Sequence, residues 1–309
     1  MSSNVAISVR DLNKIYGVGS KNEKVALNNI SLQVKKGSIF GLLGPNGAGK
    51  STFINILADL VRKTSGHIDI FGMSHHENLK DVKKLMGIVP QELNIDPFFT
   101  PYELLEIQAG LFGVPKKNRR TNEILKLLAL EDKSHAYART LSGGMRRRLL
   151  IAKAMVHQPP ILILDEPTAG VDVELRNNLW ENVKELNKEG VTIILTTHYL
   201  LEAQEMCDRI AILDKGNLVA LDTTERLLER IQTKKIKFKV KDFDLNTELS
   251  MRGIEFGIIS KNIIRASYKK NSLNFTEIIN YLNKNNIKIE DISTDDGDLE
   301  DVFVQLTKH

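Results

Sequence analysis

A glycine-rich segment carries the strongest chemical signal in the chain: Gly44-Pro45-Asn46-Gly47-Ala48-Gly49-Lys50-Ser51-Thr52. The apolar run at 39–43 predicts a buried strand before it, and the pattern at 53–58 predicts a helix after it. In that setting the glycines let main-chain N–H groups point at an anion, and the helix dipole adds to them. The segment therefore predicts a phosphate site, in which Lys50 reaches the outer phosphates and the Ser51 hydroxyl holds Mg²⁺. A tight turn that merely contains Gly and Lys is the alternative.

Two adjacent carboxylates supply a second chemical signal. Asp165 and Glu166 follow the apolar run 161–164, which predicts a strand buried on both faces. The carboxyl end of such a strand is where α/β sheets bind ligands. Beside a phosphate loop, Asp165 would hold Mg²⁺ together with the loop hydroxyl, and Glu166 would orient or deprotonate an attacking water. The alternative for Glu166 is a surface acid beside Pro167.

A second glycine pair precedes a predicted helix. Ser142 could cap that helix, and Gly143 and Gly144 would expose main-chain N–H groups, so this is another helix start able to bind an anion. Its place on a helical insertion leaves open whether one chain can fold it back onto its own phosphate loop. Arg146–Arg148 follow it. Without interleaved aromatic residues they favour a role at the helix surface or near nucleotide over a nucleic-acid patch.

The composition narrows the class of protein. The chain has 309 residues and a net charge of +4, which gives no reason to expect non-specific binding to nucleic acid. Its single cysteine, Cys207, cannot form an intrachain disulfide and is expected to be a small buried group. No apolar run approaches the ~18 residues of a membrane-spanning helix, and no signal peptide is evident. A membrane role would therefore have to come from a partner.

Hydrophobic periodicity divides the first 223 residues. Alternation over 1–37 predicts antiparallel strands at one edge of the fold. Helical spacing dominates 92–157, where Thr100 is expected to cap a helix, so we expect a helical insertion. The buried strands predicted at 161–164 and 191–196, with a helix between them, favour a parallel sheet covered on both faces.

The composition changes beyond Thr233. Residues 234–240 alternate strictly, which predicts a strand with one apolar and one basic face. Further short strands and the helical stripes at 275–282 and 299–306 predict a small α+β domain of roughly 80 residues. We therefore expect a first domain over 1–223 and an accessory domain over 224–309.

Six motifs follow one another in an ordered series: the phosphate loop, Val89-Pro90-Gln91-Glu92, Leu141-Ser142-Gly143-Gly144, 161–166, Ala169-Gly170-Val171-Asp172 and Thr196-Thr197-His198. Over roughly the first 220 residues this order resembles the ATP-binding-cassette (ABC) transporter ATPases. The resemblance implies an α/β P-loop NTPase fold with a mixed sheet core, an antiparallel β subdomain and a helical signature subdomain at about 92–157. The small C-terminal α+β domain would follow it.

The resemblance also implies roles for individual residues. Tyr16 would stack on adenine, with an edge-strand packing residue as the alternative. Gln91 would touch Mg²⁺ and sense the membrane partner, Glu166 would be the catalytic base, and His198 would contact the γ-phosphate. Asp172 would cross between subunits. The implied nucleotide-binding set is Tyr16, Gly44, Pro45, Asn46, Gly47, Ala48, Gly49, Lys50, Ser51, Thr52, Ser142, Gly143, Gly144 and Asp172. The implied Mg²⁺ ligands are Ser51, Gln91 and Asp165.

One position departs from the commonest family pattern. The signature usually ends in Gln, whereas here Met145 takes that place, which puts one side-chain contact to nucleotide in doubt. A Met followed by basic residues and Leu is similar to export ATPases whose permease is a separate ABC-2-type chain. The run Leu299-Glu300-Asp301-Val302-Phe303 also resembles the accessory domain of that group.

The function implied is an ATP-binding and ATP-hydrolysing subunit of a membrane exporter. Two copies would close head to tail around two ATP and drive a separate ABC-2-type permease docked near Gln91 and 98–112. The complex would lie at the cytoplasmic face of a bacterial inner membrane. A soluble ABC ATPase acting on ribosome or DNA is the alternative, but such chains usually carry two cassettes or long coiled-coil insertions. An importer subunit is a third possibility.

Overall fold

The computed structural model describes residues 4–169, 173–231, 233–241, 249–269, 275–295 and 297–307. The chain divides into an N-terminal unit, Met1–Thr223, and a C-terminal unit, Thr224–His309. Each unit has its own hydrophobic core, and each is described here by itself.

The strands of the N-terminal unit are β1 (Val5–Tyr16), β2 (Lys24–Lys35), β3 (Ile39–Leu43), β4 (Ser65–Ile70), β5 (Met73–Ser74), β6 (Met86–Val89), β7 (Ile161–Asp165), β8 (Thr192–Thr196), β9 (Arg209–Asp214) and β10 (Asn217–Thr223). Its α-helices are α1 (Lys50–Leu57), α2 (Leu79–Lys84), α3 (Pro101–Leu111), α4 (Thr121–Leu127), α5 (Gly143–Met155), α6 (Val173–Lys188) and α7 (Leu200–Met206). Short 3₁₀ turns are η1 (Lys116–Asn118), η2 (Glu131–Lys133) and η3 (Ala138–Thr140).

The central sheet has the order β10-β9-β3-β8-β7-β6. Strands β9, β3, β8, β7 and β6 pair in parallel, and β10 joins the edge as an antiparallel strand beside β9. The inner strands β3 and β8 are buried along their whole length, as their continuous apolar runs predict. Because parallel strands share one direction, the segments after β3, β7 and β8 gather at one edge of the sheet.

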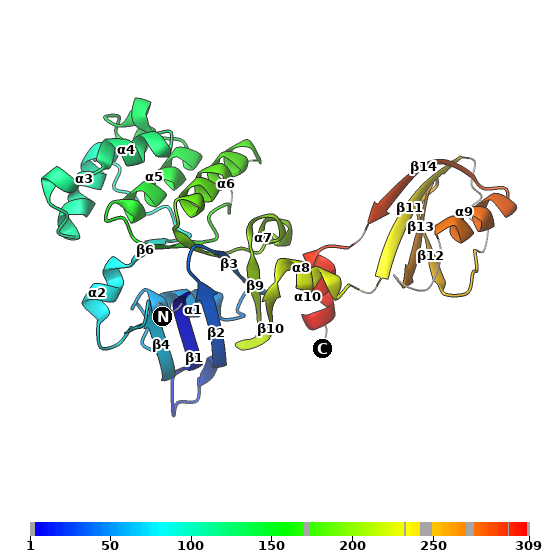
Figure 1. The fold of residues 1–309 in the computed structure, drawn as a ribbon, viewed down its shortest axis with the longest axis horizontal. Helices are drawn as coiled ribbons and strands as arrows, with labels where there is room; N and C mark the ends of the chain where they lie inside the picture. The colour runs from blue at the N-terminus through cyan, green and yellow to red at the C-terminus, as the bar shows by residue number, and fades with distance from the viewer. Residues whose placement is uncertain are drawn as a thin grey trace. The chain divides into compact units, whose positions relative to one another are not determined.

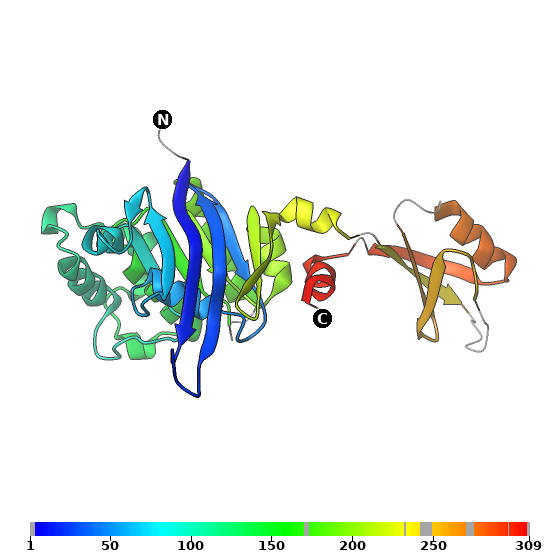
Figure 2. The same ribbon diagram turned by 90° about the horizontal axis from the view of Figure 1, so that it is seen from below.

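An antiparallel sheet of order β2-β1-β4-β5 forms a second layer. Helix α1 buries Phe53, Ile56 and Leu57 in a core shared with both sheets, where Leu12 and Ile163 also lie. Helices α3, α4 and α5 gather on the other side of the central sheet from β1, β2 and β4 (Figure 1). Figure 2 shows the long strands β1 and β2 running side by side.

The helical insertion expected at 92–157 contains α3, α4 and α5 and no strand, and all of its residues are described. Thr100 caps α3 as expected: its hydroxyl accepts from Glu103 N at 3.2 Å, and the Glu103 carboxylate accepts from Thr100 N at 2.9 Å. This reciprocal capping box, with Pro101 at the first helical position, fixes where the helix begins. Of the described helices, none is both long and apolar enough to cross a bilayer.

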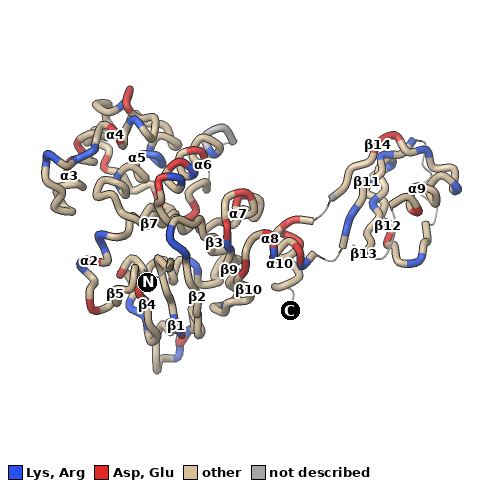
Figure 3. The backbone as a smooth tube through the Cα atoms, in the orientation of Figure 1, with Lys and Arg blue, Asp and Glu red and all other residues tan. Residues whose placement is uncertain are grey.

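The C-terminal unit contains α8 (Thr224–Glu229), β11 (Thr233–Lys241), β12 (Ile254–Ser260), β13 (Ile263–Lys269), α9 (Phe275–Lys284), β14 (Lys288–Asp295) and α10 (Leu299–Thr307). Its strands form an antiparallel sheet of order β12-β13-β11-β14. Ile236, Phe238 and Val240 of β11 are buried with Ile278 and Leu282 of α9. The alternate residues of β11 are lysines, which colour that strand in Figure 3. One face of the strand is therefore apolar and the other basic, as the alternation predicts.

Candidate active site

A cavity of about 830 Å³ opens in the N-terminal unit where the segments after β3, β7 and β8 meet. Ten of the residues expected at the site line it: Tyr16, Asn46, Gly47, Gly49, Lys50, Ser51, Thr52, Gln91, Glu166 and His198. Lys24, Ala26, Ala169 and Tyr199 complete the lining. Folding thus brings together residues from six separated stretches of the chain.

The phosphate loop is held in a conformation that favours glycine. Gly49 has φ 109°, and a Cβ there would lie 2.6 Å from the main-chain oxygen of Ala26 on β2. A side chain at this position would therefore force the loop and β2 apart. The close approach allows α1 to begin at Lys50 with its first N–H groups directed at the cavity.

Lys50 is buried, and its ammonium group binds the loop itself. Nζ donates to Gly44 O at 2.7 Å and to Pro45 O at 3.2 Å. Burial lowers the pKa of Lys50, while the negative charges of Glu166 and Asp165 act in the opposite direction. A phosphate could replace these two carbonyl oxygens as the acceptor, because a charged acceptor binds an ammonium group more strongly than a neutral one.

The ends of β7 and β8 are joined through Thr196. Its hydroxyl donates to Asp165 Oδ1 at 2.5 Å and accepts from Glu166 N at 3.0 Å. Glu166 has φ 45°, so the chain turns sharply immediately after the strand. This turn carries the side chain of Glu166 into the cavity, whereas Asp165 is not among the described residues that line it.

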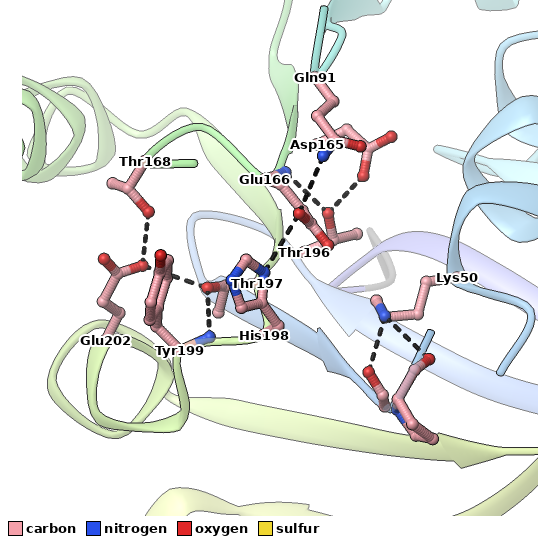
Figure 4. A network of polar contacts seen from close by, with 12 residues as sticks. Lys50, Gln91, Asp165, Glu166, Thr168, Thr196, Thr197, His198, Tyr199 and Glu202 are labelled. Atoms are coloured by element: carbon pink, nitrogen blue, oxygen red, sulfur yellow. Dashed lines mark hydrogen bonds and ion pairs between the residues drawn. The ribbon is translucent and has the colours of Figure 1, made fainter. Parts of the chain in front are cut away.

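The carboxylate of Glu166 contacts two other residues that line the cavity. Its Oε2 accepts from Gln91 Nε2 at 3.1 Å and lies 3.2 Å from His198 Nδ1 (Figure 4). Because an ionised carboxylate can only accept, the second contact requires a hydrogen on Nδ1. The Glu166 side chain is 13% exposed and that of His198 is 45% exposed, so the pair spans the cavity wall and the solvent. The residues expected to act together are therefore in contact.

Oxygen-bearing side chains suited to a divalent ion are few here. In the described parts of the chain, no group of three or more His, Cys, Asp or Glu is placed to hold a metal. Mg²⁺ commonly takes one or two protein oxygens and completes its shell with substrate phosphates and water. Ser51 and Gln91 line the cavity, and Asp165 lies behind Thr196. This donor set fits a Mg²⁺ ion that arrives with a nucleotide.

Tyr16 lies at the end of β1 and is 38% exposed at the cavity rim. Lys24 faces it across the β1–β2 ladder, and Lys14 Nζ lies 4.5 Å from the centre of its ring. A partly exposed aromatic ring with two lysines nearby suits a flat base on an anionic ligand. Lys24 was missed from the sequence, since only the strand register places it opposite Tyr16.

The second helix start lies outside this cavity. Ser142 caps α5, its Oγ accepting from Met145 N at 3.2 Å, as expected. Ser142, Gly143 and Gly144 are not among the described residues that line the cavity. Asp172, expected to cross between subunits, lies outside the described residues. Within one chain the two helix N-termini therefore do not share a site.

The three arginines after the signature bind main-chain carbonyls. Arg146 Nε donates to Leu141 O at 3.0 Å, and Arg148 donates to Leu128 O and Ala129 O. Arg147 is 4% exposed and donates to Pro90 O at 2.9 Å, next to Gln91. Its burial lowers the pKa of Arg147, and the charge of Asp165 opposes that shift. Arginines engaged with their own main chain do not form a nucleic-acid patch, but the burial of Arg147 differs from the expected place at the helix surface. The tie from α5 to the Gln91 segment was missed from the sequence.

Comparison with known proteins gives a consistent result. The family model described as "ABC transporter" matches residues 27–169. The chain is 39% identical to the linearmycin resistance ATP-binding protein LnrL of Bacillus subtilis over 73% of its own length and 71% of that relative. It is 37% identical to Nod factor export ATP-binding protein I of Cupriavidus metallidurans, over 72% of its own length and 73% of that relative.

A dimeric post-hydrolysis ATP-binding cassette bound to ADP and Pi matches the fold with a TM-score of 0.62. The identity is 27%, over 71% of this chain and 98% of the other. The expected P-loop ABC ATPase fold is confirmed by these matches and by the mixed central sheet, the antiparallel layer and the helical insertion. On this evidence the chain belongs to the ABC transporter family, as an ATP-binding subunit with ATPase activity.

Proposed function

We propose that this chain is the ATPase subunit of an exporter whose permease is a separate ABC-2-type membrane protein, and that it works as a homodimer at the cytoplasmic face of a bacterial inner membrane. The names of the relatives, which refer to resistance and to export, support this direction of transport. The observation that carries the catalytic part is the contact of Glu166 with both Gln91 and His198 at the cavity.

In this proposal the cavity binds ATP with Mg²⁺. Tyr16 stacks on the base, Lys50 leaves the Gly44 and Pro45 carbonyls for the outer phosphates, and Ser51 holds Mg²⁺ with Asp165 and Gln91. When bound, the metal neutralises charge that develops on the phosphate oxygens. Glu166 accepts a proton from the attacking water, and His198 contacts the γ-phosphate.

The position of the α5 N-terminus, outside the cavity of its own chain, supports the proposed dimer. Ser142 and Gly143 are exposed and stand outside the cavity of their own chain. In a head-to-tail pair, the ATP held by one copy would meet these N–H groups of the other. Binding would close the pair because one triphosphate serves two helix N-termini. Loss of the γ-phosphate would weaken that bridge, with Asp172 crossing near the shared boundary.

The surface near Gln91 supports a permease contact. A cavity of about 460 Å³ is lined by Met86, Pro90, Asn94, Gln108 and Phe112 among others. Phe98 is 70% exposed and Leu111 is 77% exposed in the adjoining segment. Exposed large apolar side chains beside a groove are typical of protein interfaces. Because Pro90, which lines this cavity, is bonded to Gln91, a partner that moves Pro90 would also move the Gln91 contact with Glu166.

Replacing Glu166 by Gln tests the catalytic and dimer proposals together. We expect E166Q to bind ATP, to lose hydrolysis by about 100-fold or more, and to sediment as a dimer with ATP–Mg²⁺ but as a monomer with ADP. Glu181→Gln, an exposed position on α6, is the matched control and should behave as the native chain. Native turnover by E166Q would rule Glu166 out as the base.

The partner is tested by copurification from cells producing the chain. A multi-span membrane protein in the same fraction supports the exporter proposal. Ribosomes or DNA in that fraction would instead support a soluble ABC ATPase.

A further inference from the structure

One buried carboxylate lies outside the cavity and has no role in the proposal above. Glu202, on α7, is 6% exposed and is not among the described residues that line the cavity. Carboxylates are almost never this buried unless they are paired. Its partners therefore indicate why the fold keeps a charge at this position.

Three segments of the chain converge on Glu202. Oε2 accepts from the hydroxyl of Thr168 at 2.8 Å and from that of Thr197 at 3.2 Å, and Oε1 lies 3.2 Å from Arg176 Nε. Figure 4 shows the hydroxyls of Thr168 and Thr197 converging on one oxygen of this carboxylate. Thr168 and Thr197 are each 1% exposed, so these hydrogen bonds are shielded from water.

The partners flank the residues at the centre of the site. Thr168 is two residues after Glu166, and Thr197 immediately precedes His198. The hydroxyl of Thr197 also accepts from Tyr199 N at 3.0 Å, which fixes the main chain on both sides of His198. The Tyr199 ring lies 4.1 Å from the His198 ring and 4.8 Å from the Arg176 guanidinium. One carboxylate thus contacts the loop after β7, the loop after β8 and a residue of α6.

We propose that Glu202 is a positioning residue for ATP hydrolysis, which holds the loops of Glu166 and His198 at a fixed separation. This inference rests on the roles proposed above for those two residues. The 3.2 Å contact between Glu166 and His198 depends on the relative placement of two loops, and Thr196 joins these loops only at the strand ends. Glu202 provides a second attachment, through Thr168, two residues after Glu166, and through Thr197, the residue between Thr196 and His198. A displacement of about 1 Å at a reacting group can reduce a rate about 100-fold.

Glu202→Gln tests the proposal because Gln keeps the size of the side chain and removes the charge that faces Arg176. We expect kcat to fall about 10-fold or more, with the KM for ATP within about twofold of the native value. The midpoint of thermal unfolding should shift by only a few degrees, since most of the packing is retained. Glu205→Gln on the same helix is exposed and should leave all three quantities unchanged.

A double-mutant cycle separates positioning from mere support of the fold. Thr197→Val removes one hydroxyl donor with little change of volume and serves as the milder variant if E202Q folds poorly. Because both residues act through one carboxylate, the double variant should be only slightly less active than the more impaired of the two single variants. Effects on kcat that multiply, or a loss of kcat that follows the fraction of unfolded protein, would overturn the proposal.

The same experiments distinguish this inference from the proposal on which it rests. If E166Q and His198→Ala both retain native hydrolysis, the roles given to those residues fail, and the inference fails with them. If both variants lose hydrolysis while E202Q behaves like Glu205→Gln, the site roles stand and the positioning role of Glu202 is rejected.

Discussion

Among the described helices, α1 and α5 begin at the glycine-rich turns for which we propose anion binding, and they differ in what surrounds them. At α1 the phosphate loop packs closely against β2: a Cβ on Gly49 would meet Ala26 O at 2.6 Å, and Lys50 binds two loop carbonyls. At α5 the space is open: a Cβ on Gly143 would meet nothing within 4 Å. The start of α1 is thus enclosed by its own chain, whereas Ser142 and Gly143 at the start of α5 are exposed.

This contrast teaches that a phosphate-binding helix start is defined by its surroundings as much as by its glycines. The same chemistry serves the chain's own cavity in the first case. In the second it is available to a second molecule, as the proposed dimer requires.

Gly143→Arg should reduce ATP hydrolysis by about 100-fold or more and leave the midpoint of thermal unfolding unchanged, because the side chain enters open space in the monomer but the partner's site in the dimer.

Gly49→Ala should instead lower that midpoint and weaken nucleotide binding, since its φ of 109° and the nearby Ala26 carbonyl resist a Cβ. Activity assays, calorimetric nucleotide titrations and thermal melts distinguish the two. Unimpaired hydrolysis by Gly143→Arg would contradict the shared site.

Mixing two inactive chains sharpens the comparison. Lys50→Ala should lose its own phosphate site, and Gly143→Arg should lose the surface offered to a partner. In a mixed dimer, the first variant supplies α5 and the second supplies Lys50, so one of the two sites is restored. With half of the dimers mixed, we expect activity to return to about a quarter of the native level. Each variant alone is the control, and a mixture as inactive as its components would break the two-helix interpretation.

His157, which follows α5, connects the end of this helix to β6 of the central sheet. Replacing it tests how much that connection contributes to stability. Its Nε2 lies 3.2 Å from Met86 O of β6, and its ring stacks on Phe112 at 3.7 Å. Burial lowers the pKa of His157, although the Met86 carbonyl acts in the opposite direction. Below pH about 6.5 the unfolded chain therefore binds a proton that the folded chain resists, and the free energy of unfolding falls.

His157→Gln should make this fall shallower between pH 8 and pH 5.5, as measured by urea unfolding at each pH. His76→Gln, at an exposed position, should leave the slope as in the native chain. An identical pH slope in the His157 variant would show that the histidine is not the group responsible.

The smallest effect is expected from the cap of α3. Thr100→Ala removes the hydroxyl that accepts from Glu103 N and should lower the free energy of unfolding by about 1 kcal/mol. Thr100→Ser keeps the cap and should recover most of that loss in the same urea titration. Because α3 lies beside the helix that carries Gly143, a loss of hydrolysis far beyond this change in stability would show that the cap also positions the second site.

Local sequence was sufficient for several features. The run from Gly44 to Thr52 specifies its own turn and helix start, and the Thr100–Glu103 pair specifies where α3 begins, because these interactions span only a few residues. The alternation at 234–240 similarly specifies which face of β11 is buried. The ordered motifs also indicated that Gln91, Glu166 and His198 share a site, and the structure places them in contact.

Other features depended on contacts between distant residues. No sequence pattern indicated that Arg147 would bind Pro90 O, that Lys24 would face Tyr16, or that Asp165 would bind Thr196 instead of lining the cavity. Each follows from strand register or from contacts between segments 31 to 57 residues apart, which no local pattern encodes.

The sequence by itself determined the chemistry of this protein, since glycines, a lysine and two carboxylates at fixed spacings limit which ligand the chain can bind. The tertiary structure alone decided how the groups proposed to act in hydrolysis are held. Thr168, Arg176, Thr197 and Glu202 are ordinary polar residues in the linear chain, and they become a unit because two parallel strands end side by side and α7 covers the loops that follow. Spacing along a chain can specify a local turn, but the separation of two loops is set by the sheet that carries them.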